Sequence, residues 1–163
     1  MPIYNKVEIG RIAQQHGFVR DTFEKVLRLK EILRYLNEEE YLREHLLLKG
    51  GTAINLTIFN LPRLSVDIDM DYTPNDTKED MLEAREKITV LIKDYMDAEG
   101  YQLSKGSRFT HSLEAFYYQY QNAGGNGDMI KIELNYSLRA HILNRYIEEF
   151  FRKYLMMAWR FAW

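Results

Sequence analysis

Alternation of charged and apolar residues along two segments constrains the fold of this chain more than any other feature. Asp67, Asp69 and Asp71 recur at every second position of residues 66–72, and Lys131, Glu133 and Asn135 do so within residues 128–137. Successive side chains of a β-strand point to opposite faces, so each segment predicts a strand with one apolar and one polar face. Side chains of the two polar faces meet only if the strands are neighbours in one sheet.

Other periodicities predict the remaining elements of a mixed α+β or α/β domain. Apolar residues recur near the helical period from residue 21 to about 45, where Asp21 and Glu24 resemble a capping box and residues 38–40 mark a break. The clearest helix covers residues 77–98, with Thr77 and Asp80 as its cap pair. We further expect a strand or helix end at 45–49, a short helix at 52–60, strands at 101–109 and 113–121, a hairpin loop at 122–127, and an aromatic-rich helix at 143–163.

Length and composition fit one compact domain spanning residues 1–163. Hydrophobic residues make up 46% of the chain, which is enough for a single core. We expect an N-terminal extension at 1–20, a core at 21–142 and a C-terminal helix at 143–163. The chain has no cysteine, which excludes disulfides and thiolate metal sites. Without an apolar leader or an apolar run of about 18 residues, we expect a cytoplasmic protein with no membrane span.

Charge is segregated along the chain, although the formal net charge is only −2. Residues 61–100 hold five basic and eleven acidic side chains, whereas residues 101–163 hold eight basic and five acidic ones. The acidic part contains the aspartate strand, and local negative charge is what a divalent cation needs. A solvated acidic helix after that strand explains the same imbalance without any function.

The two predicted polar faces favour a metal-dependent site for phosphoryl transfer. If the strands are neighbours, Asp67, Asp69 and Glu133 can converge on one or two Mg²⁺ or Mn²⁺ ions while Lys131 meets phosphate. Gly50-Gly51-Thr52 precedes a short predicted helix, where backbone N–H groups can bind phosphate. The alternative is structural, because alternating charges are common on solvated sheet faces and paired glycines often serve turn geometry alone.

Two spaced segments resemble a known family. Residues 48–53 read Leu-Lys-Gly-Gly-Thr-Ala, and residues 61–70 read Leu-Pro-Arg-Leu-Ser-Val-Asp-Ile-Asp-Met. They resemble the K-G-G-T-A-L and R-x-S-x-D-I-D-L elements of the AbiEii/AbiGii toxin family of nucleotidyltransferases. Residues 130–135 resemble the later lysine-containing motif of that family. The resemblance implies a nucleotidyltransferase-like fold, with a mixed β-sheet flanked by helices, over roughly residues 21–145.

The resemblance also implies roles for individual residues. Asp67 and Asp69 match the metal-binding pair of the family, and Lys131 matches a nucleotide-binding lysine. The other residues implied in nucleotide binding are Lys49, Gly50, Gly51, Thr52, Arg63 and Ser65, and for Arg63 and Ser65 a purely structural part is the alternative. Glu133 as a third carboxylate follows from strand alternation rather than from the family. Asp71 is a further acidic candidate that the family does not require.

The implied function is transfer of a nucleoside monophosphate from a nucleoside triphosphate to an RNA, such as tRNA, or to a protein. The family implies the toxin of a toxin–antitoxin or abortive-infection system, with an antitoxin as partner. The chain lacks the downstream motif of the family, and we expect its apolar helix at 143–163 to begin a missing helical region or to bind a second copy or a partner. A non-catalytic nucleotide- or partner-binding remnant of the family is the alternative.

Two further patterns are expected to be structural. The four histidines, His16, His45, His111 and His141, fall at no metal-ligand spacing, which disfavours a histidine-based metal hydrolase. The aromatic run at residues 116–120 could stack on bases, but aromatic residues that alternate in a strand more often pack in the core.

Overall fold

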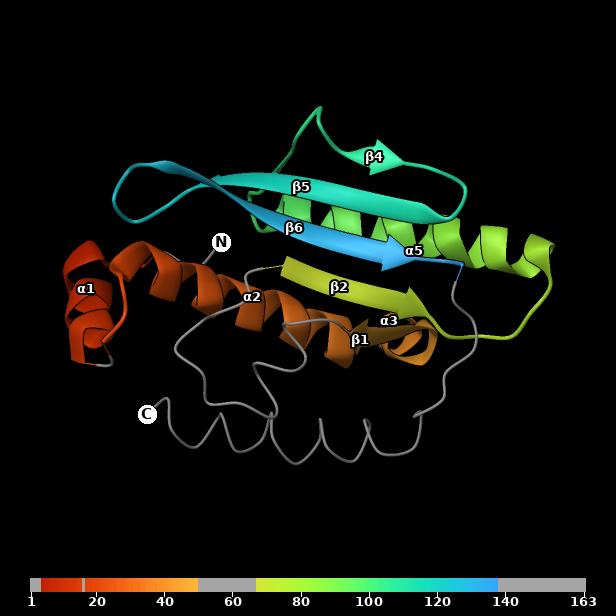
Figure 1. Cartoon of the computed structure of the whole chain (residues 1–163), viewed down its shortest axis with the longest axis horizontal. Helices are drawn as coiled ribbons and strands as arrows, with labels where there is room; N and C mark the ends of the chain where they lie inside the picture. The colour runs from red at the N-terminus through yellow and green to blue at the C-terminus, as the bar shows by residue number, and fades with distance from the viewer. Residues whose placement is uncertain (1–3, 16, 50–66, 138–163) are drawn as a thin grey trace.

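The computed structural model describes residues 4–15, 17–49 and 67–137, which form helices and strands in mixed order (Figure 1). The first part is mostly helical: α1 Lys6–Gln15, α2 Arg20–Glu38, α3 Glu40–His45 and β1 Leu46–Lys49. The second part holds β2 Asp67–Tyr72, α5 Lys78–Ala98, β3 Gln102–Leu103, β4 Arg108–Phe109, β5 Leu113–Gln121 and β6 Gly127–Asn135. The helices expected at 52–60 and 143–163 lie outside the described residues.

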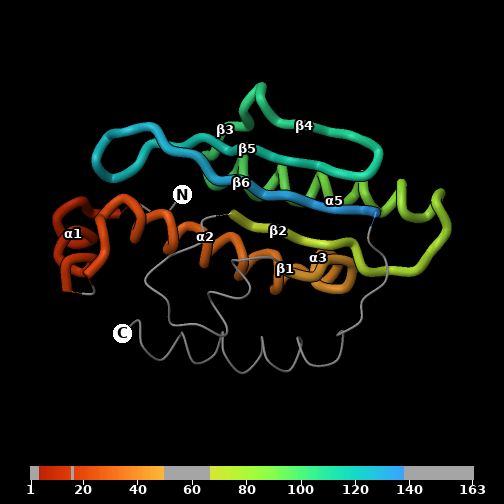
Figure 2. The backbone as a smooth tube through the Cα atoms, viewed as in Figure 1, coloured from red at the N-terminus to blue at the C-terminus, as the bar shows by residue number. Residues whose placement is uncertain are grey.

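The strands in this part of the chain form one six-stranded mixed sheet. Its order is β1-β2-β6-β5-β3, and β4 also pairs with β5. β2 and β6 run parallel, whereas the other paired strands are antiparallel. Figure 2 shows β2 and β6 side by side, although a long stretch of chain separates them. The mixed sheet flanked by helices confirms the predicted architecture and is compatible with a nucleotidyltransferase-like fold.

One face of the sheet packs against α2 and α5. The alternate residues of β2 and β6 that point to this face are almost fully buried, and they are Ile68, Met70, Ile130, Ile132 and Leu134. The helices supply Leu29, Ile32, Leu33 and Leu36 from α2 and Met81, Ala84, Ile88, Ile92 and Met96 from α5. Tyr35 of α2 stacks on Tyr95 of α5 with ring centroids 3.9 Å apart, so the two helices also contact each other. The core therefore lies on one side of the sheet.

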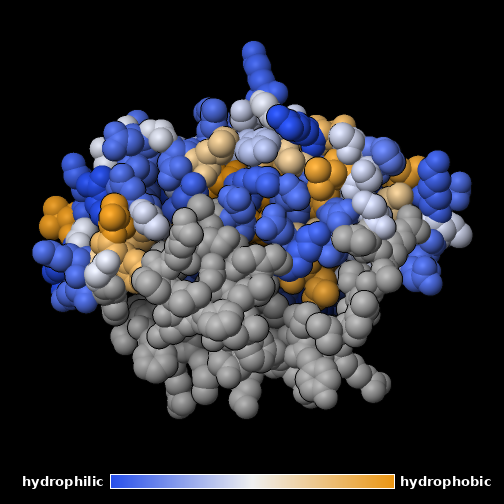
Figure 3. Space-filling model, viewed as in Figure 1, coloured by the Kyte–Doolittle hydropathy of each residue, from blue (hydrophilic) through white to orange (hydrophobic). Residues whose placement is uncertain are grey.

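Hydrophilic residues cover most of the described surface in the view of Figure 3. The large hydrophobic residues that are exposed lie on several elements: Val7, Val19, Leu82, Val90, Leu103, Phe109 and Met129. Exposed hydrophobic residues of this kind are normal on a folded domain. None of the described helices combines the length and the apolar character that crossing a bilayer requires.

The helix at 77–98 and the hairpin form as their sequence signals predict. The hydroxyl of Thr77 accepts the Asp80 backbone N–H at 3.1 Å and caps the first turn of α5. In the loop between β5 and β6, the Asn122 N–H donates to the Asn126 carbonyl at 2.8 Å, and Gly125 adopts a φ of 86°. Only glycine enters that conformation without steric cost, so this turn explains the glycine-rich sequence.

Three local predictions need revision. The helix expected over 21 to about 45 is two helices, and Glu39 separates them because its carboxylate accepts the Leu42 N–H at 2.6 Å and caps α3. This break lies where residues 38–40 predicted one. The capping box is wrong, since Val19 precedes the first turn of α2 without a side-chain cap. The strand expected at 101–109 is two short strands, because a turn closed by the Ser107 N–H and the Ser104 carbonyl at 3.1 Å interrupts it.

The N-terminal extension contains a helix that the sequence patterns did not predict. Helix α1 packs against α2, with Ile9 and Ala13 buried. The Asn5 side chain accepts the Val7 N–H at 2.9 Å and the Glu8 N–H at 3.2 Å, so this residue caps the start of α1.

Candidate functional site

The two strands with alternating charges are neighbours in the sheet. Parallel pairing of β2 and β6 places Asp67 beside Lys131, Asp69 beside Glu133 and Asp71 beside Asn135. Residues paired in this way lie on the same face, so the aspartates share one face with Lys131, Glu133 and Asn135. We call this the polar face. The two polar faces predicted from the sequence therefore meet, because their strands are neighbours in one sheet.

The same alternation that builds the core fixes the polar face. Ile68 and Met70 have 0% and 5% of their surface exposed, so a shift of β2 by one residue would bury aspartates against α2 and α5. The cost of burying unpaired carboxylates excludes that register. Burial of the apolar residues thus holds Asp67 and Asp69 on the opposite side of the sheet.

Strand β1 adds a cation to the polar face. Lys49 lies opposite Asp69 in the antiparallel register, yet its Nζ reaches diagonally to Asp71 and forms an ion pair at 2.5 Å. Asp71 is buried, with 9% of its surface exposed, so Lys49 supplies the positive charge that this carboxylate requires. Sequence reasoning placed Lys49 at the entrance of a phosphate loop and missed this ion pair, although both residues lie on the polar face of adjacent strands.

A second lysine lies on the other side of the aspartates. The Nζ of Lys131 and Oε2 of Glu133 are 2.8 Å apart, and both side chains are about a quarter exposed. The hydrogen bond with Glu133 raises the pKa of Lys131, and the charges of Asp67 and Asp69 raise it further. Lys131 is therefore fully charged at neutral pH and lies directly beside the aspartates.

Negative charge is crowded around Asp69. Burial raises the pKa of Asp69 above its usual value, and this effect is opposed by Lys131, strengthened by Glu133 and Asp67, and opposed more weakly by Lys49. The nearby lysines do not fully compensate for burial and the neighbouring acids. An added cation would stabilise the ionised form of Asp69.

The three-carboxylate metal site stays a prediction. Within residues 4–15, 17–49 and 67–137, no three aspartate, glutamate or histidine side chains are grouped so that they could hold a metal ion. Glu133 is beside Asp69 in register, but its carboxylate binds Lys131. Asp67 and Asp69 remain as a pair of carboxylates on one strand face, and one or two carboxylates are the usual protein contribution to a Mg²⁺ site that also binds phosphates.

The other predicted nucleotide-binding residues belong to the segment that follows β1 in the sequence. Gly50, Gly51, Thr52, Arg63 and Ser65 lie outside the described residues, and their implied roles stay predictions. Lys49 is the last residue of β1 and directly precedes Gly50 in the sequence.

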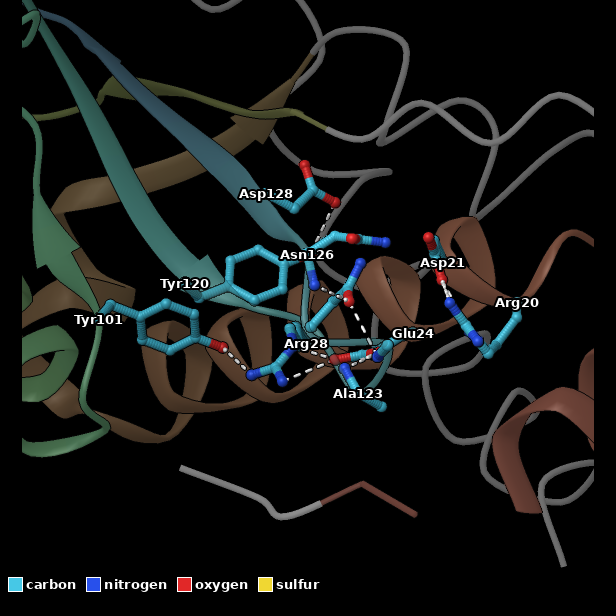
Figure 4. Close-up of polar contacts among 11 residues, drawn as sticks. Arg20, Asp21, Glu24, Arg28, Tyr101, Tyr120, Ala123, Asn126 and Asp128 are labelled. Atoms are coloured by element: carbon cyan, nitrogen blue, oxygen red, sulfur yellow. Dashed lines mark hydrogen bonds and ion pairs between the residues drawn. The ribbon is translucent and has the colours of Figure 1, made fainter. Parts of the chain in front are cut away.

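A separate cluster of buried charges joins α2 to the hairpin loop (Figure 4). Glu24 and Arg28 are 0% and 2% exposed, and Arg28 donates to Oε1 of Glu24 from Nε at 3.0 Å and from Nη2 at 2.7 Å. The other carboxylate oxygen accepts the Ala123 N–H at 2.8 Å. The Arg28 guanidinium also lies 4.3 Å from the centroid of the Tyr120 ring. These contacts satisfy the pair, which makes the cluster structural.

Sequence reasoning missed this cluster because it assigned Glu24 to a helix cap. The available signal was the spacing of Glu24 and Arg28, which places them one turn apart within an amphipathic helix. Lys25 extends the cluster to β6, where its ion pair with Asp128 measures 3.2 Å and the Tyr120 hydroxyl donates to the same carboxylate at 3.0 Å.

One histidine and two residues of the aromatic run have structural contacts among the described residues. His45 contacts the Tyr41 carbonyl through Nδ1 at 2.8 Å and stacks on the Tyr41 ring, so its role is structural. His16 and His141 lie outside the described residues. Phe116 and Tyr118 are fully buried in the core, whereas Tyr117 between them points to the polar face and is partly exposed.

Comparison with known families agrees with this arrangement. A family model described as "Nucleotidyl transferase AbiEii toxin, Type IV TA system" matches residues 31–158, which include β1, β2, β6 and the whole polar face. A search of curated proteins gives no match to the chain. The family match covers most of the sequence and includes both strands that carry the alternating charges. The chain therefore belongs to the AbiEii nucleotidyl transferase toxin family.

Proposed function

We propose that this chain transfers a nucleoside monophosphate from a nucleoside triphosphate to a hydroxyl group of an acceptor, with pyrophosphate as leaving group. The observation that carries the proposal is the parallel register of β2 and β6, which places Asp67 and Asp69 beside Lys131 and Glu133 on one sheet face. Membership of a nucleotidyl transferase family supports the same reaction.

The donor set of the polar face fits Mg²⁺, or Mn²⁺, as the cofactor. Asp67 and Asp69 offer hard oxygen ligands two residues apart on one strand face, and the raised pKa of Asp69 marks negative charge that a cation would balance. A divalent ion bound there would polarise the phosphoryl group and make the attacking hydroxyl more acidic. Glu133 could join the ligands through Oε1, because its ion pair with Lys131 uses Oε2.

The lysines on either side of the aspartates supply positive charge for the triphosphate. Lys131 lies beside Asp67 in register and Lys49 lies opposite Asp69, so phosphates that meet the aspartates through a cation also come near both ammonium groups. Lysine binds phosphate as a point charge and tolerates several geometries. The acceptor provides the nucleophile, so the protein needs no nucleophilic side chain and acts by positioning and charge compensation.

The biological setting follows the family description. As a type IV toxin, the protein would modify a cellular target, and we propose an RNA acceptor such as tRNA, because a blocked 3′ end stops translation. A protein acceptor is the competing possibility. The antitoxin of the same system is the expected partner, and the cytoplasm is the expected location of both.

The test is a transfer assay with labelled nucleoside triphosphates, tRNA and Mg²⁺. We expect a labelled RNA product from the unmodified chain, no product with a chelator present, and at least 100-fold less product from the Asp67→Asn, Asp69→Asn double variant. Asp94→Asn is the matched control, because Asp94 is an exposed aspartate on α5. Equal labelling by the double variant and the control would refute the proposed reaction.

A non-catalytic nucleotide-binding role is the second candidate. It is favoured by the Lys131–Glu133 ion pair, which engages one oxygen of the carboxylate expected to be the third metal ligand. Calorimetry distinguishes the two functions, because nucleotide binding without any transfer product supports the second and product formation excludes it.

A further inference from the structure

The polar face continues beyond the charged strands. In the antiparallel register, Glu133 of β6 lies opposite Ala115 of β5, and Ala115 lies opposite Arg108 of β4. Residues directly opposite each other on antiparallel strands share a face. One row therefore crosses five strands on the polar face: Lys49, Asp69, Glu133, Ala115 and Arg108.

The charge changes sign along this row. Three aspartates and Glu133 lie on β2 and β6, whereas the segment from residue 101 to 113 contains no acidic residue and includes Lys105, Arg108 and His111. Arg108 is exposed, and no carboxylate in the described part of the chain forms an ion pair with Lys105 or Arg108. The outer edge of the polar face thus offers positive charge that no carboxylate among the described residues pairs with.

An aromatic ring lies between the two charged regions. Tyr117 of β5 is opposite Lys131 and partly exposed on the polar face. Its backbone is anchored to the turn between β3 and β4, because its N–H donates to Ser107 Oγ at 3.0 Å and its carbonyl accepts the Ser104 N–H at 2.7 Å. An aromatic ring beside cationic side chains is the usual means of binding single-stranded nucleic acid, since the ring stacks on a base and the cations contact phosphates.

We propose that Tyr117 and Arg108 bind a single strand of nucleic acid, the acceptor, whose reacting end lies at Asp67 and Asp69. This inference rests on the proposed function. Neighbouring strands lie about 4.8 Å apart, so three strand spacings separate Arg108 from Asp69 by about 14 Å, which about four stacked nucleotides would cover. The phosphates of a strand that runs from Asp69 to Arg108 would lie progressively farther from the acidic strands β2 and β6 and closer to Arg108.

A nucleic acid fits this surface better than a protein acceptor does. The polar face of β5 carries no charge: Ala115 is buried at 2% exposure, whereas Leu113, Tyr117, Gln119 and Gln121 are partly or fully exposed. A strand of phosphates that crosses it meets no carboxylate between Glu133 and Arg108. The contacts on offer are a cation, a ring and amide groups, which suit backbone phosphates and bases of any sequence.

Binding of labelled oligonucleotides to the full chain tests the inference. Fluorescence anisotropy is measured over a range of salt concentrations, without nucleotide or metal, using single-stranded RNA and DNA of the same sequence. We expect Arg108→Gln to weaken binding about three- to tenfold and to lower the slope of log affinity against log salt by about 0.7. We expect Tyr117→Leu to weaken binding about tenfold with the slope unchanged. Arg11→Gln is the matched control, because Arg11 is exposed on α1, away from β4 in Figure 1.

The outcomes separate this inference from the proposed reaction. Weaker oligonucleotide binding in Arg108→Gln but not in Arg11→Gln supports binding at Tyr117 and Arg108. Tighter binding of RNA than of DNA would support an RNA acceptor. Equal binding of the two also supports the inference and indicates that the surface contacts phosphates and bases without contacting the 2′-hydroxyl. Absence of binding, equal effects of Arg108→Gln and Arg11→Gln, or label transferred to protein instead of nucleic acid would overturn it. If the chain binds oligonucleotides through Arg108 but transfers no nucleotide, the proposed reaction is refuted, whereas the nucleic-acid-binding surface at Tyr117 and Arg108 is supported.

Discussion

The buried cluster around Glu24 and Arg28 and the polar face around Asp67 and Asp69 both gather charged side chains from several elements, but they balance charge differently. In the cluster, Glu24 accepts hydrogen bonds from Arg28 and the Ala123 N–H and is inaccessible to water. On the polar face, Asp67 and Asp69 stay partly exposed, and burial with neighbouring acids raises the pKa of Asp69. A satisfied buried pair stabilises the fold, whereas a partly exposed site with an unfavourable charge balance is suited to a ligand.

The largest expected effect breaks the buried cluster. Glu24→Ala leaves the Arg28 charge buried without its carboxylate, so we expect the free energy of unfolding to fall by about 3–5 kcal/mol. Urea denaturation of the purified protein measures this change.

A matched control for Glu24→Ala is Glu31→Ala, about two turns further along the same helix. The Glu31–Arg34 ion pair measures 2.6 Å but is far more exposed, with 32% of the Glu31 side chain and 47% of the Arg34 side chain accessible, so Glu31→Ala should cost less than about 1 kcal/mol. The double variant Glu24→Met, Arg28→Met should recover much of the loss, because apolar side chains avoid the buried charge. Equal losses in Glu24→Ala and Glu31→Ala would show that the buried pair is not the structural element described here.

An intermediate effect, dependent on pH, is expected at the edge of the cluster. Burial alone would raise the pKa of Asp128, but hydrogen bonds from the Met129 N–H, Tyr120 and Lys25, with the Lys25 charge, lower it overall. A lowered pKa means that the ionised carboxylate stabilises the folded state above the unfolded pKa of about 3.9, and that this stabilisation is lost as pH falls through the lower folded value.

We therefore expect Asp128→Asn to destabilise the protein by about 1–2 kcal/mol at pH 7, with a difference that shrinks in acid. Unfolding curves of both proteins between neutral and acidic pH measure this trend. A difference that grew as pH fell would contradict the assigned direction of the pKa shift.

The smallest expected effect has the opposite sign and lies on the polar face. Because the pKa of Asp69 is raised, the ionised carboxylate is less favourable in the folded protein than in the unfolded chain at neutral pH. Asp69→Asn should therefore raise the melting temperature by about 1–3 °C, as expected where a site keeps unfavourable charge for function. Asp94→Asn on the exposed side of α5 should leave it unchanged, and a clear loss of stability in Asp69→Asn would contradict the comparison.

Local sequence signals predicted most of the fold. Alternation predicted β2 and β6 because each strand buries only one face, and the glycine-rich loop predicted the hairpin because the chain must reverse there. The capping box failed because Glu24 binds Ala123, which is 99 residues away in the sequence, and no local pattern reveals that contact. The 101–109 strand failed because a short turn at Ser104 outweighs strand propensity.

The polar face was predicted only in part, because local alternation shows which residues share a face but not which strands are neighbours. Its residue types follow from alternation, but strand order and direction depend on the packing of α2 and α5 on the other side of the sheet. Two features depend on strand registers that only the folded structure fixes. They are the diagonal ion pair between Lys49 and Asp71 and the position of Arg108 in the same cross-strand row as Asp69.

The central claim is that the polar face, and not the buried cluster, binds metal and nucleotide. Isothermal titration calorimetry of the full chain with a nucleoside triphosphate and Mg²⁺ tests it most directly, with the Asp67→Asn, Asp69→Asn double variant and Asp128→Asn compared with the unmodified protein. We predict magnesium-dependent binding to the unmodified chain and to Asp128→Asn, and at least tenfold weaker binding to the double variant. Binding that is equal in all three proteins, or lost only in Asp128→Asn, would contradict the account.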